Sequence, residues 1–124
     1  MKRILVIDDE ADIREVIEAA LELTRDWQVL QAASAEAGLS VADKTQPDAI
    51  LLDVMMPGMD GPTAFARLQK EAHTRLIPVV LLTAKVQSAD RRRFAALGVA
   101  GVIDKPFDPM RLAEQIEALL GWDG

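Results

Sequence analysis

The sequence predicts an α/β domain, a (βα)5 fold in which five strands form a doubly wound parallel sheet. Two patterns predict this fold. Short apolar runs rich in branched residues recur along the chain, as expected of strands buried on both faces. Segments with helical spacing lie between these runs, and parallel strands need such crossover helices. Because 124 residues are a common domain size, we expect residues 1–124 to form a single domain.

The predicted strands are the short apolar runs of the sequence. The run at residues 29–33 is weaker than the others. A helical pattern follows each run, and right-handed crossovers then cover both faces of the sheet with helices. The predicted strands span residues 4–7, 29–33, 49–52, 79–82 and 99–103.

The first predicted helix has the clearest pattern. One of its faces follows the spacing i, i+3, i+4, i+7, and charged residues lie on the opposite face. Ser34 is the predicted N-cap of a second helix that continues to Lys44, and Pro62 fits the first turn of a third. The core-facing positions of the first helix are Ile13, Val16, Ile17, Ala20, Leu21 and Thr24.

Glycine and proline mark the last two predicted helices. A fourth helix is predicted at about residues 85–97, with Gly98 ending it. The fifth has Asp108 as its N-cap and Pro109 at its first position. Gly121 is expected to end it.

The composition excludes several classes of function. With 20 acidic against 14 basic residues, the net charge is −6, which disfavours direct binding to nucleic acid. Cysteine is absent and His73 is the single histidine, which excludes disulfides, thiol nucleophiles and sites with two histidines. No run approaches the roughly 18 apolar residues that span a bilayer. The first apolar run stops at Asp8, too early for a signal peptide, so we expect a soluble cytoplasmic protein without membrane contact.

Polar residues follow the strands at the edge where ligands bind in such sheets. Asp8 and Asp9 follow the first strand, and Asp53 follows the third. Thr83 and Lys105 follow the fourth and fifth. Neighbouring carboxylates suit Mg²⁺, while an ammonium and a hydroxyl can bind phosphoryl oxygens. Together these groups could form an acyl phosphate on a carboxylate nucleophile.

Each of these residues also has a structural interpretation. Asp8 and Asp9 could cap the first helix, and Asp53 could be a turn residue. Thr83 could be the N-cap of the fourth helix, and Lys105 could lie in an exposed loop. Their common position after successive strands is hard to explain as a set of independent structural choices.

Four segments carry a resemblance to a known family. In order and spacing they resemble the receiver domain of bacterial response regulators, the CheY-like module with a flavodoxin-like fold, over essentially the whole chain. The resemblance implies two-component signalling rather than an enzyme. A sensor histidine kinase or a histidine phosphotransfer protein would donate the phosphoryl group, and a conformational change would control a downstream effector. The segments are ILVIDDE at residues 4–10, LLDVMMPGMDG at 51–61, LLTA at 81–84 and DKPF at 104–107.

The resemblance also implies a role for each site residue. Asp53 would be the phosphoacceptor, Thr83 would bind the acyl phosphate, and Lys105 would pair with a phosphate oxygen. The bond between Lys105 and Pro106 is expected to be cis. The implied ligands of Mg²⁺ are the side chains of Asp8, Asp9 and Asp53 and the backbone carbonyl of Met55.

One position departs from the family pattern, and two others occupy positions that tune the reaction rate in the family. Val102 stands where the family often has tyrosine or phenylalanine, so a rotating aromatic side chain cannot be the switch element. Met55 and Lys85 occupy positions that influence access of the hydrolytic water in the family. The resemblance also admits a phosphorylation-dependent homodimer.

Two alternative functions stay open at this point. The chain could be a Mg²⁺-dependent hydrolase of small phosphate esters with Asp53 as nucleophile, although Met55 stands where such an enzyme would carry an acid. It could also be a pseudo-receiver that only binds a partner. The complete acidic set and Lys105 argue against this second alternative.

Overall fold

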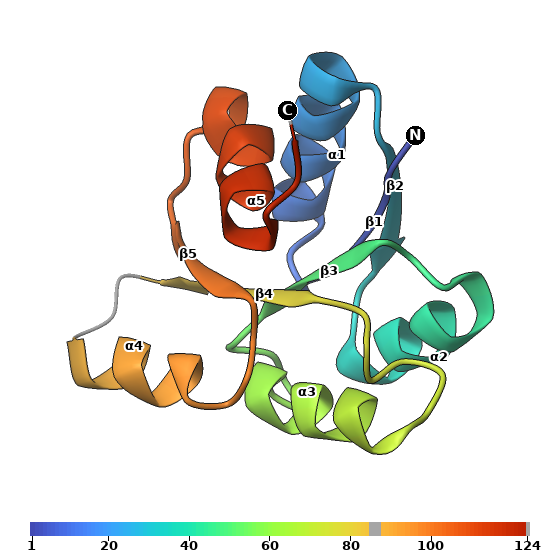
Figure 1. Cartoon of the computed structure of the whole chain (residues 1–124), viewed down its shortest axis with the longest axis vertical. Helices are drawn as coiled ribbons and strands as arrows, with labels where there is room; N and C mark the ends of the chain where they lie inside the picture. Colours follow the sequence, from blue (N-terminus) through green and yellow to red (C-terminus); the bar gives the residue numbers. More distant parts are fainter. Residues whose placement is uncertain (85–87, 124) are drawn as a thin grey trace.

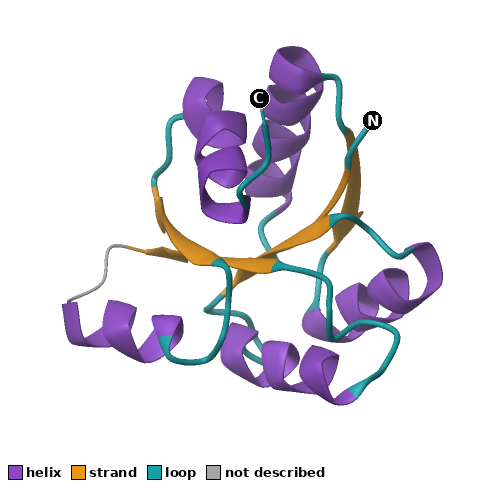
Figure 2. Ribbon diagram, in the orientation of Figure 1, coloured by secondary structure: helices purple, strands orange, loops and turns teal. Residues whose placement is uncertain are grey.

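In the computed structural model, which describes residues 1–84 and 88–123, a five-stranded parallel sheet lies between two layers of helices (Figures 1 and 2). The strands are β1 (Arg3–Ile7), β2 (Gln28–Ala32), β3 (Ala49–Asp53), β4 (Val79–Ala84) and β5 (Gly101–Lys105). The helices are α1 (Ala11–Arg25), α2 (Ala35–Thr45), α3 (Gly61–Lys70), α4 (Ser88–Ala95) and α5 (Leu112–Leu120), with a 3-10 turn at Pro109–Arg111. The predicted (βα)5 doubly wound fold is confirmed.

The strand order is β2-β1-β3-β4-β5, and all neighbours are parallel. The chain runs from β1 outward to β2 and then returns to the other side of β1 with β3. The order therefore reverses between β1 and β3, which is where such sheets bind ligands. Pairing of Ile7 with Leu52 brings the carboxyl ends of these two strands to the same edge.

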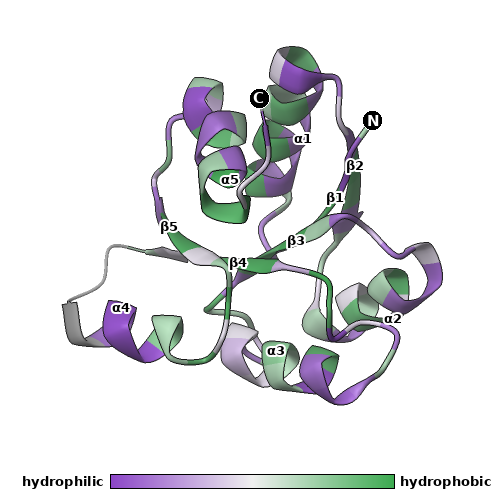
Figure 3. Cartoon of the chain, viewed as in Figure 1, coloured by the Kyte–Doolittle hydropathy of each residue, from purple (hydrophilic) through white to green (hydrophobic). Residues whose placement is uncertain are grey.

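Alternate residues of the central strands build two cores, one on each face of the sheet. Leu5 and Ile7 pack with apolar residues of α2, α3 and α4, whereas Ile4 and Val6 pack with those of α1 and α5. Figure 3 shows hydrophobic residues along the strands between the two helix layers. Because both faces of the sheet are covered, its strands read as continuous apolar runs rather than as alternating ones.

The predicted helix ends are largely confirmed. Ser34 caps α2 by accepting a hydrogen bond from the backbone N–H of Ala37 (3.2 Å), and Pro62 lies in the first turn of α3. Gly121 follows α5 with φ of 70°, the left-handed conformation typical of a helix stop. No helix among residues 1–84 and 88–123 combines the length and the apolar character needed to cross a bilayer.

Some predicted boundaries are wrong. The fifth strand is predicted at residues 99–103, but β5 extends from Gly101 to Lys105, because pairing with β4 sets its limits, not apolarity. Residues 109–111 form a 3-10 turn instead of the first α-helical turn, and the carboxylate of Asp108 accepts a hydrogen bond from the N–H of Met110 (3.0 Å). The fourth helix is predicted to continue to residue 97, but α4 ends at Ala95. Its predicted start at Lys85 lies outside the described residues.

Candidate functional site

An acidic cluster lies at the point where the strand order reverses. Asp8 follows β1, and Asp53 is the last residue of the neighbouring β3. One carboxylate oxygen from each of Asp8, Asp9 and Asp53 lies within 4.8 Å of the others. Asp8 and Asp53 are buried, while Asp9 is exposed, so the cluster opens to solvent on the side of Asp9.

Lys105 brings a positive charge to this cluster from the end of β5. Its Nζ lies 2.7 Å from Oδ2 of Asp8 and 3.4 Å from Oδ1 of Asp53. The peptide bond between Lys105 and Pro106 is cis, as expected. The interpretation of Lys105 as an exposed loop residue is wrong, because it ends a strand and its side chain is only 16% exposed.

Burial and charge perturb the two groups that face each other across the cluster. Burial and the neighbouring carboxylate of Asp8 raise the pKa of Asp53 to about 6, although Lys105 and the N–H of Met55 oppose this rise. Burial lowers the pKa of Lys105, but its hydrogen bond to Asp8 and the nearby carboxylates outweigh that effect and raise it. One ammonium cannot neutralise three carboxylates, so a bound cation would relieve the remaining repulsion.

One carboxylate oxygen of Asp53 has protein partners, and the other has none among the described residues. Oδ1 accepts a hydrogen bond from the N–H of Met55 (3.4 Å) and contacts Lys105. Asp8 forms the same kind of turn, with its Oδ1 accepting from the N–H of Glu10 (2.9 Å). Oδ2 of Asp53 receives no hydrogen bond from any described residue. Asp53 is therefore the last residue of a strand and not a turn residue, although its Oδ1 accepts from the backbone N–H of Met55 in the turn that follows. Its other oxygen is available for chemistry.

The helix-cap interpretations are wrong. The N-cap of α1 is Glu10, not Asp8 or Asp9. Thr83 lies within β4 and is buried, and its hydroxyl donates a hydrogen bond to the carbonyl of Ala84 (3.1 Å).

Thr83 and Met55 lie beside the cluster. Leu82 pairs with Asp53 across the β3–β4 ladder, so Thr83 is one step further along the neighbouring strand. No hydrogen bond joins Thr83 to the carboxylate of Asp53 in the part of the chain that the structure describes. The side chain of Met55 is exposed, and its N–H is the group that faces Asp53. The phosphate-binding role of Thr83 and the metal-ligand role of the Met55 carbonyl stay predictions.

The sequence reasoning missed Gly61, which packs against the end of β3 at Asp53 and Val54. Its N–H donates to the carbonyl of Val54 (2.9 Å), and a Cβ at this position would lie 2.6 Å from the carbonyl oxygen of Asp53. The signal was present in the sequence, since a glycine between Asp60 and Pro62 at a helix start is typical of a close backbone approach.

A contact between Arg91 and Asp104 was also missed. The two residues form an ion pair that joins α4 to β5, and Asp104 pairs with Thr83 across the β4–β5 ladder. Oδ1 of Asp104 is buried and has no hydrogen-bond partner among the described residues. Val102 is half-buried at the usual aromatic position and packs against the core on the side of α4.

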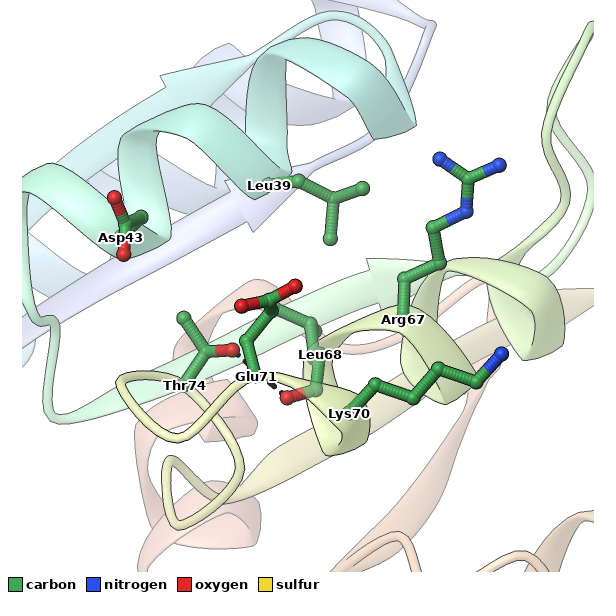
Figure 4. A pocket seen from close by; sticks show the side chains of 7 residues that line it. All are labelled: Leu39, Asp43, Arg67, Leu68, Lys70, Glu71 and Thr74. Atoms are coloured by element: carbon green, nitrogen blue, oxygen red, sulfur yellow. Dashed lines mark hydrogen bonds between the residues drawn. The ribbon is translucent and has the colours of Figure 1, made fainter.

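A pocket of about 370 Å³ between α2 and α3 has no part in this cluster (Figure 4). Helices that follow parallel strands run back across the sheet, so their C-terminal ends lie at the edge opposite the acidic cluster. The pocket lies at that opposite edge, and Figure 4 shows side chains from both helices around it. It is lined by Leu39, Asp43, Arg67, Leu68, Lys70, Glu71 and Thr74.

The comparisons with known proteins agree with this geometry. The chain matches the family model of the response regulator receiver domain over residues 4–117, and it belongs to that family. It is 40% identical over 119 residues to the phosphate regulon transcriptional regulatory protein PhoB of Escherichia coli, covering 96% of this chain and 52% of that protein. It is 38% identical over 120 residues to the DNA-binding dual master transcriptional regulator RpaA of Synechocystis, covering 97% of this chain and 49% of that protein. The chain thus spans about half the length of these curated relatives.

A solved structure gives the same result for the fold. The chemotaxis response regulator CheY4 of Vibrio cholerae superposes with a TM-score of 0.88 at 27% identity, covering 96% of this chain and 98% of that one. The chain is therefore a receiver domain of two-component systems with a CheY-like fold, and the predicted family and signalling role are confirmed.

Proposed function

We propose that Asp53 accepts a phosphoryl group from a histidine of a sensor kinase or phosphotransfer protein in a Mg²⁺-dependent reaction. One observation carries this proposal. Asp53 presents an oxygen without a protein hydrogen bond among the described residues, while Asp8, Asp9 and Lys105 surround it with groups that can bind a cation and an anion. Attack by this oxygen forms an O–P bond, the P–N bond to the donor histidine breaks, and its electron pair stays on the imidazole nitrogen.

The donor set of the cluster fits Mg²⁺, because carboxylate and carbonyl oxygens are its preferred ligands. When bound, the ion would neutralise charge on the oxygens of the phosphoryl group. Asp8, Asp9 and Asp53 are the proposed side-chain ligands, and the carbonyl of Met55 is the proposed backbone ligand.

Lys105 and Thr83 are proposed to bind the phosphorylated product. The ammonium of Lys105 already contacts Oδ1 of Asp53, so it is positioned to pair with a phosphoryl oxygen. The hydroxyl of Thr83 can turn from the carbonyl of Ala84 towards the acyl phosphate. Because Val102 is not aromatic, the change is proposed to reach the surface through α4 and β5, whose contact at Asp104 lies beside Thr83.

The wider role is proposed from the family. We take residues 1–124 as one receiver domain, supported by the family match over residues 4–117 and by the single sheet. A cytoplasmic location is proposed with it. The names of PhoB and RpaA describe transcriptional regulators, which supports an effector that controls transcription as the output. With a net charge of −6, this domain itself is not proposed to bind nucleic acid. Phosphorylation is proposed to promote a homodimer.

Incubation with acetyl phosphate and Mg²⁺ is expected to add one phosphoryl group to the wild type and none to Asp53→Asn, as measured by intact mass. The amide lacks the anionic oxygen that attacks phosphorus. Asp43→Asn, a change of the same kind on α2, is expected to behave as the wild type. Equal mass gain in Asp53→Asn would refute the proposal.

The same protein preparation separates the two alternative functions. Repeated turnover of a generic phosphate ester that Asp53→Asn abolishes would favour the hydrolase. Absence of Mg²⁺ binding in a calorimetric titration of the wild type would favour the pseudo-receiver.

A further inference from the structure

Every polar group of Asp8 has a partner. Its N–H donates to the carbonyl of Ala32 (3.1 Å), and its Oδ1 accepts from the N–H of Glu10 (2.9 Å). Its Oδ2 accepts from Lys105 (2.7 Å). Its backbone carbonyl, the remaining group, accepts a hydrogen bond from Nη1 of Arg14 (2.7 Å). Arg14 belongs to α1 and is not among the residues to which the site chemistry assigns a role.

Arg14 is itself held by Gln31, and Glu18 holds Gln31 in turn. Its Nε donates to Oε1 of Gln31 on β2 (3.0 Å), and Nε2 of Gln31 donates to Oε2 of Glu18 on α1 (3.1 Å). All three side chains are half-buried. These hydrogen bonds fix the guanidinium through both Nε and Nη1. A planar guanidinium can donate in two directions at once, whereas the ammonium of a lysine cannot replace both contacts.

We propose that Arg14 is a positioning residue of the metal site that sets the direction of the Asp9 carboxylate. The peptide between Asp8 and Asp9 is planar, so a hydrogen bond that holds the Asp8 carbonyl fixes the orientation of this plane. The plane in turn determines where the side chain of Asp9 leaves the backbone. None of the described residues donates a hydrogen bond to the carboxylate of Asp9, so the direction of this carboxylate depends on the backbone.

This inference rests on the proposed Mg²⁺ site and adds to it an outer layer of hydrogen bonds. Such outer partners of metal ligands commonly contribute 10- to 100-fold to metal affinity. A merely structural Arg14 would tie α1 to β2 and would change stability alone. A positioning Arg14 changes the affinity for Mg²⁺ even when the metal-free fold is intact.

The test compares Arg14→Met with Arg25→Met by calorimetric titration with Mg²⁺. Arg25 is a matched control, because it lies at the other end of α1 and pairs with the buried Glu117 (2.9 Å). Arg14→Met is expected to weaken Mg²⁺ binding about 10-fold. Arg25→Met is expected to leave the affinity unchanged while lowering the free energy of unfolding in EDTA.

Two further variants keep the test decisive. Arg14→Lys is expected to fall between wild type and Arg14→Met, because lysine keeps the charge but cannot hold both contacts. Gln31→Met leaves the arginine in place without its orienting acceptor, and it is expected to weaken binding less than Arg14→Met. If Arg14→Met does not fold, the test rests on Gln31→Met. An Mg²⁺ affinity of Gln31→Met equal to that of the wild type then overturns the proposal.

Phosphorylation by acetyl phosphate gives a second measurement. The Mg²⁺ concentration for half-maximal rate is expected to rise in Arg14→Met, while the rate at saturating Mg²⁺ stays near that of the wild type. Equal Mg²⁺ affinity in wild type and Arg14→Met overturns the role of Arg14 and leaves the function of Asp53 intact. A wild type that binds no Mg²⁺ overturns both.

Discussion

Replacing Asp53 with asparagine is expected to stabilise the metal-free protein at pH 7 by about 2–3 kcal/mol. Burial and the charge of Asp8 raise the pKa of Asp53 to about 6 from the ordinary aspartate value of 3.8. Each unit of pKa shift corresponds to about 1.4 kcal/mol of differential stability between the two protonation states. The neutral amide avoids the energetic cost of the buried charge and keeps a similar shape.

The pH dependence of this effect has a definite sign. Between about pH 4 and pH 6 the folded protein holds the proton of Asp53 more tightly than the unfolded chain does. Wild-type stability should therefore fall as the pH rises through this window, and the loss is complete above pH 6. The difference between Asp53→Asn and wild type is expected to be small at pH 4 and full at pH 7, as measured by urea denaturation in EDTA.

Asp60→Asn is the control for this experiment. Hydrogen bonds from the side chain and the backbone of Thr63 lower the pKa of Asp60, so its charge stabilises the fold at neutral pH and the variant should show no gain. Adding Mg²⁺ is expected to reduce the difference in unfolding free energy between Asp53→Asn and the wild type, because a ligand that binds the folded wild type stabilises it. A metal-free Asp53→Asn that is less stable than wild type at pH 7 would contradict the expected repulsion.

Replacing Gly61 with alanine is expected to cost about 2–3 kcal/mol of unfolding free energy, because its Cβ would overlap a well-packed backbone. The new methyl group would lie 2.6 Å from the carbonyl oxygen of Asp53 and 2.9 Å from Cα of Val54. Neither atom belongs to a flexible side chain, so the backbone that carries Asp53 must shift. Phosphorylation by acetyl phosphate is expected to slow together with the loss of stability.

Gly58→Ala provides the comparison. Gly58 has φ of 82°, and a Cβ added there would meet no described atom within 4 Å, so alanine costs only the left-handed conformation, about 1 kcal/mol. Urea denaturation of both variants in EDTA measures the difference. Equal losses in the two variants would show that the close approach of Gly61 to Asp53 does not limit stability.

The architecture and the cluster could be predicted from local patterns. Apolar runs that end in Asp8 and Asp53 marked buried parallel strands, and the rule for such sheets placed both carboxylates at one edge. Lys105 followed from the same rule, although its strand was displaced in the prediction. These inferences succeed because parallel strands bring their carboxyl ends to one edge of the sheet, independently of the length and conformation of the loops between them.

The remaining features depend on pairing between distant segments. The limits of β5 follow from its register with β4, which pairs Ala84 with Lys105, so apolarity alone could not locate them. The contacts of Arg14 with Gln31 and of Arg91 with Asp104 join residues that no periodicity links. Long polar side chains reach many partners, and only the folded backbone selects among them.

The sparse anchoring of α4 has a consequence for motion. Among its described side chains only Phe94 is buried, whereas α1 buries Ile17, Ala20 and Leu21. Segments with few buried apolar contacts open with low free energy, so the amide hydrogens of α4 are expected to exchange with solvent faster than those of α1. A small difference in interaction energy at the neighbouring Thr83 and Asp104 would then suffice to redistribute the populations of α4. Movement of this weakly attached helix is therefore the switch expected of a receiver that carries Val102 in place of an aromatic residue.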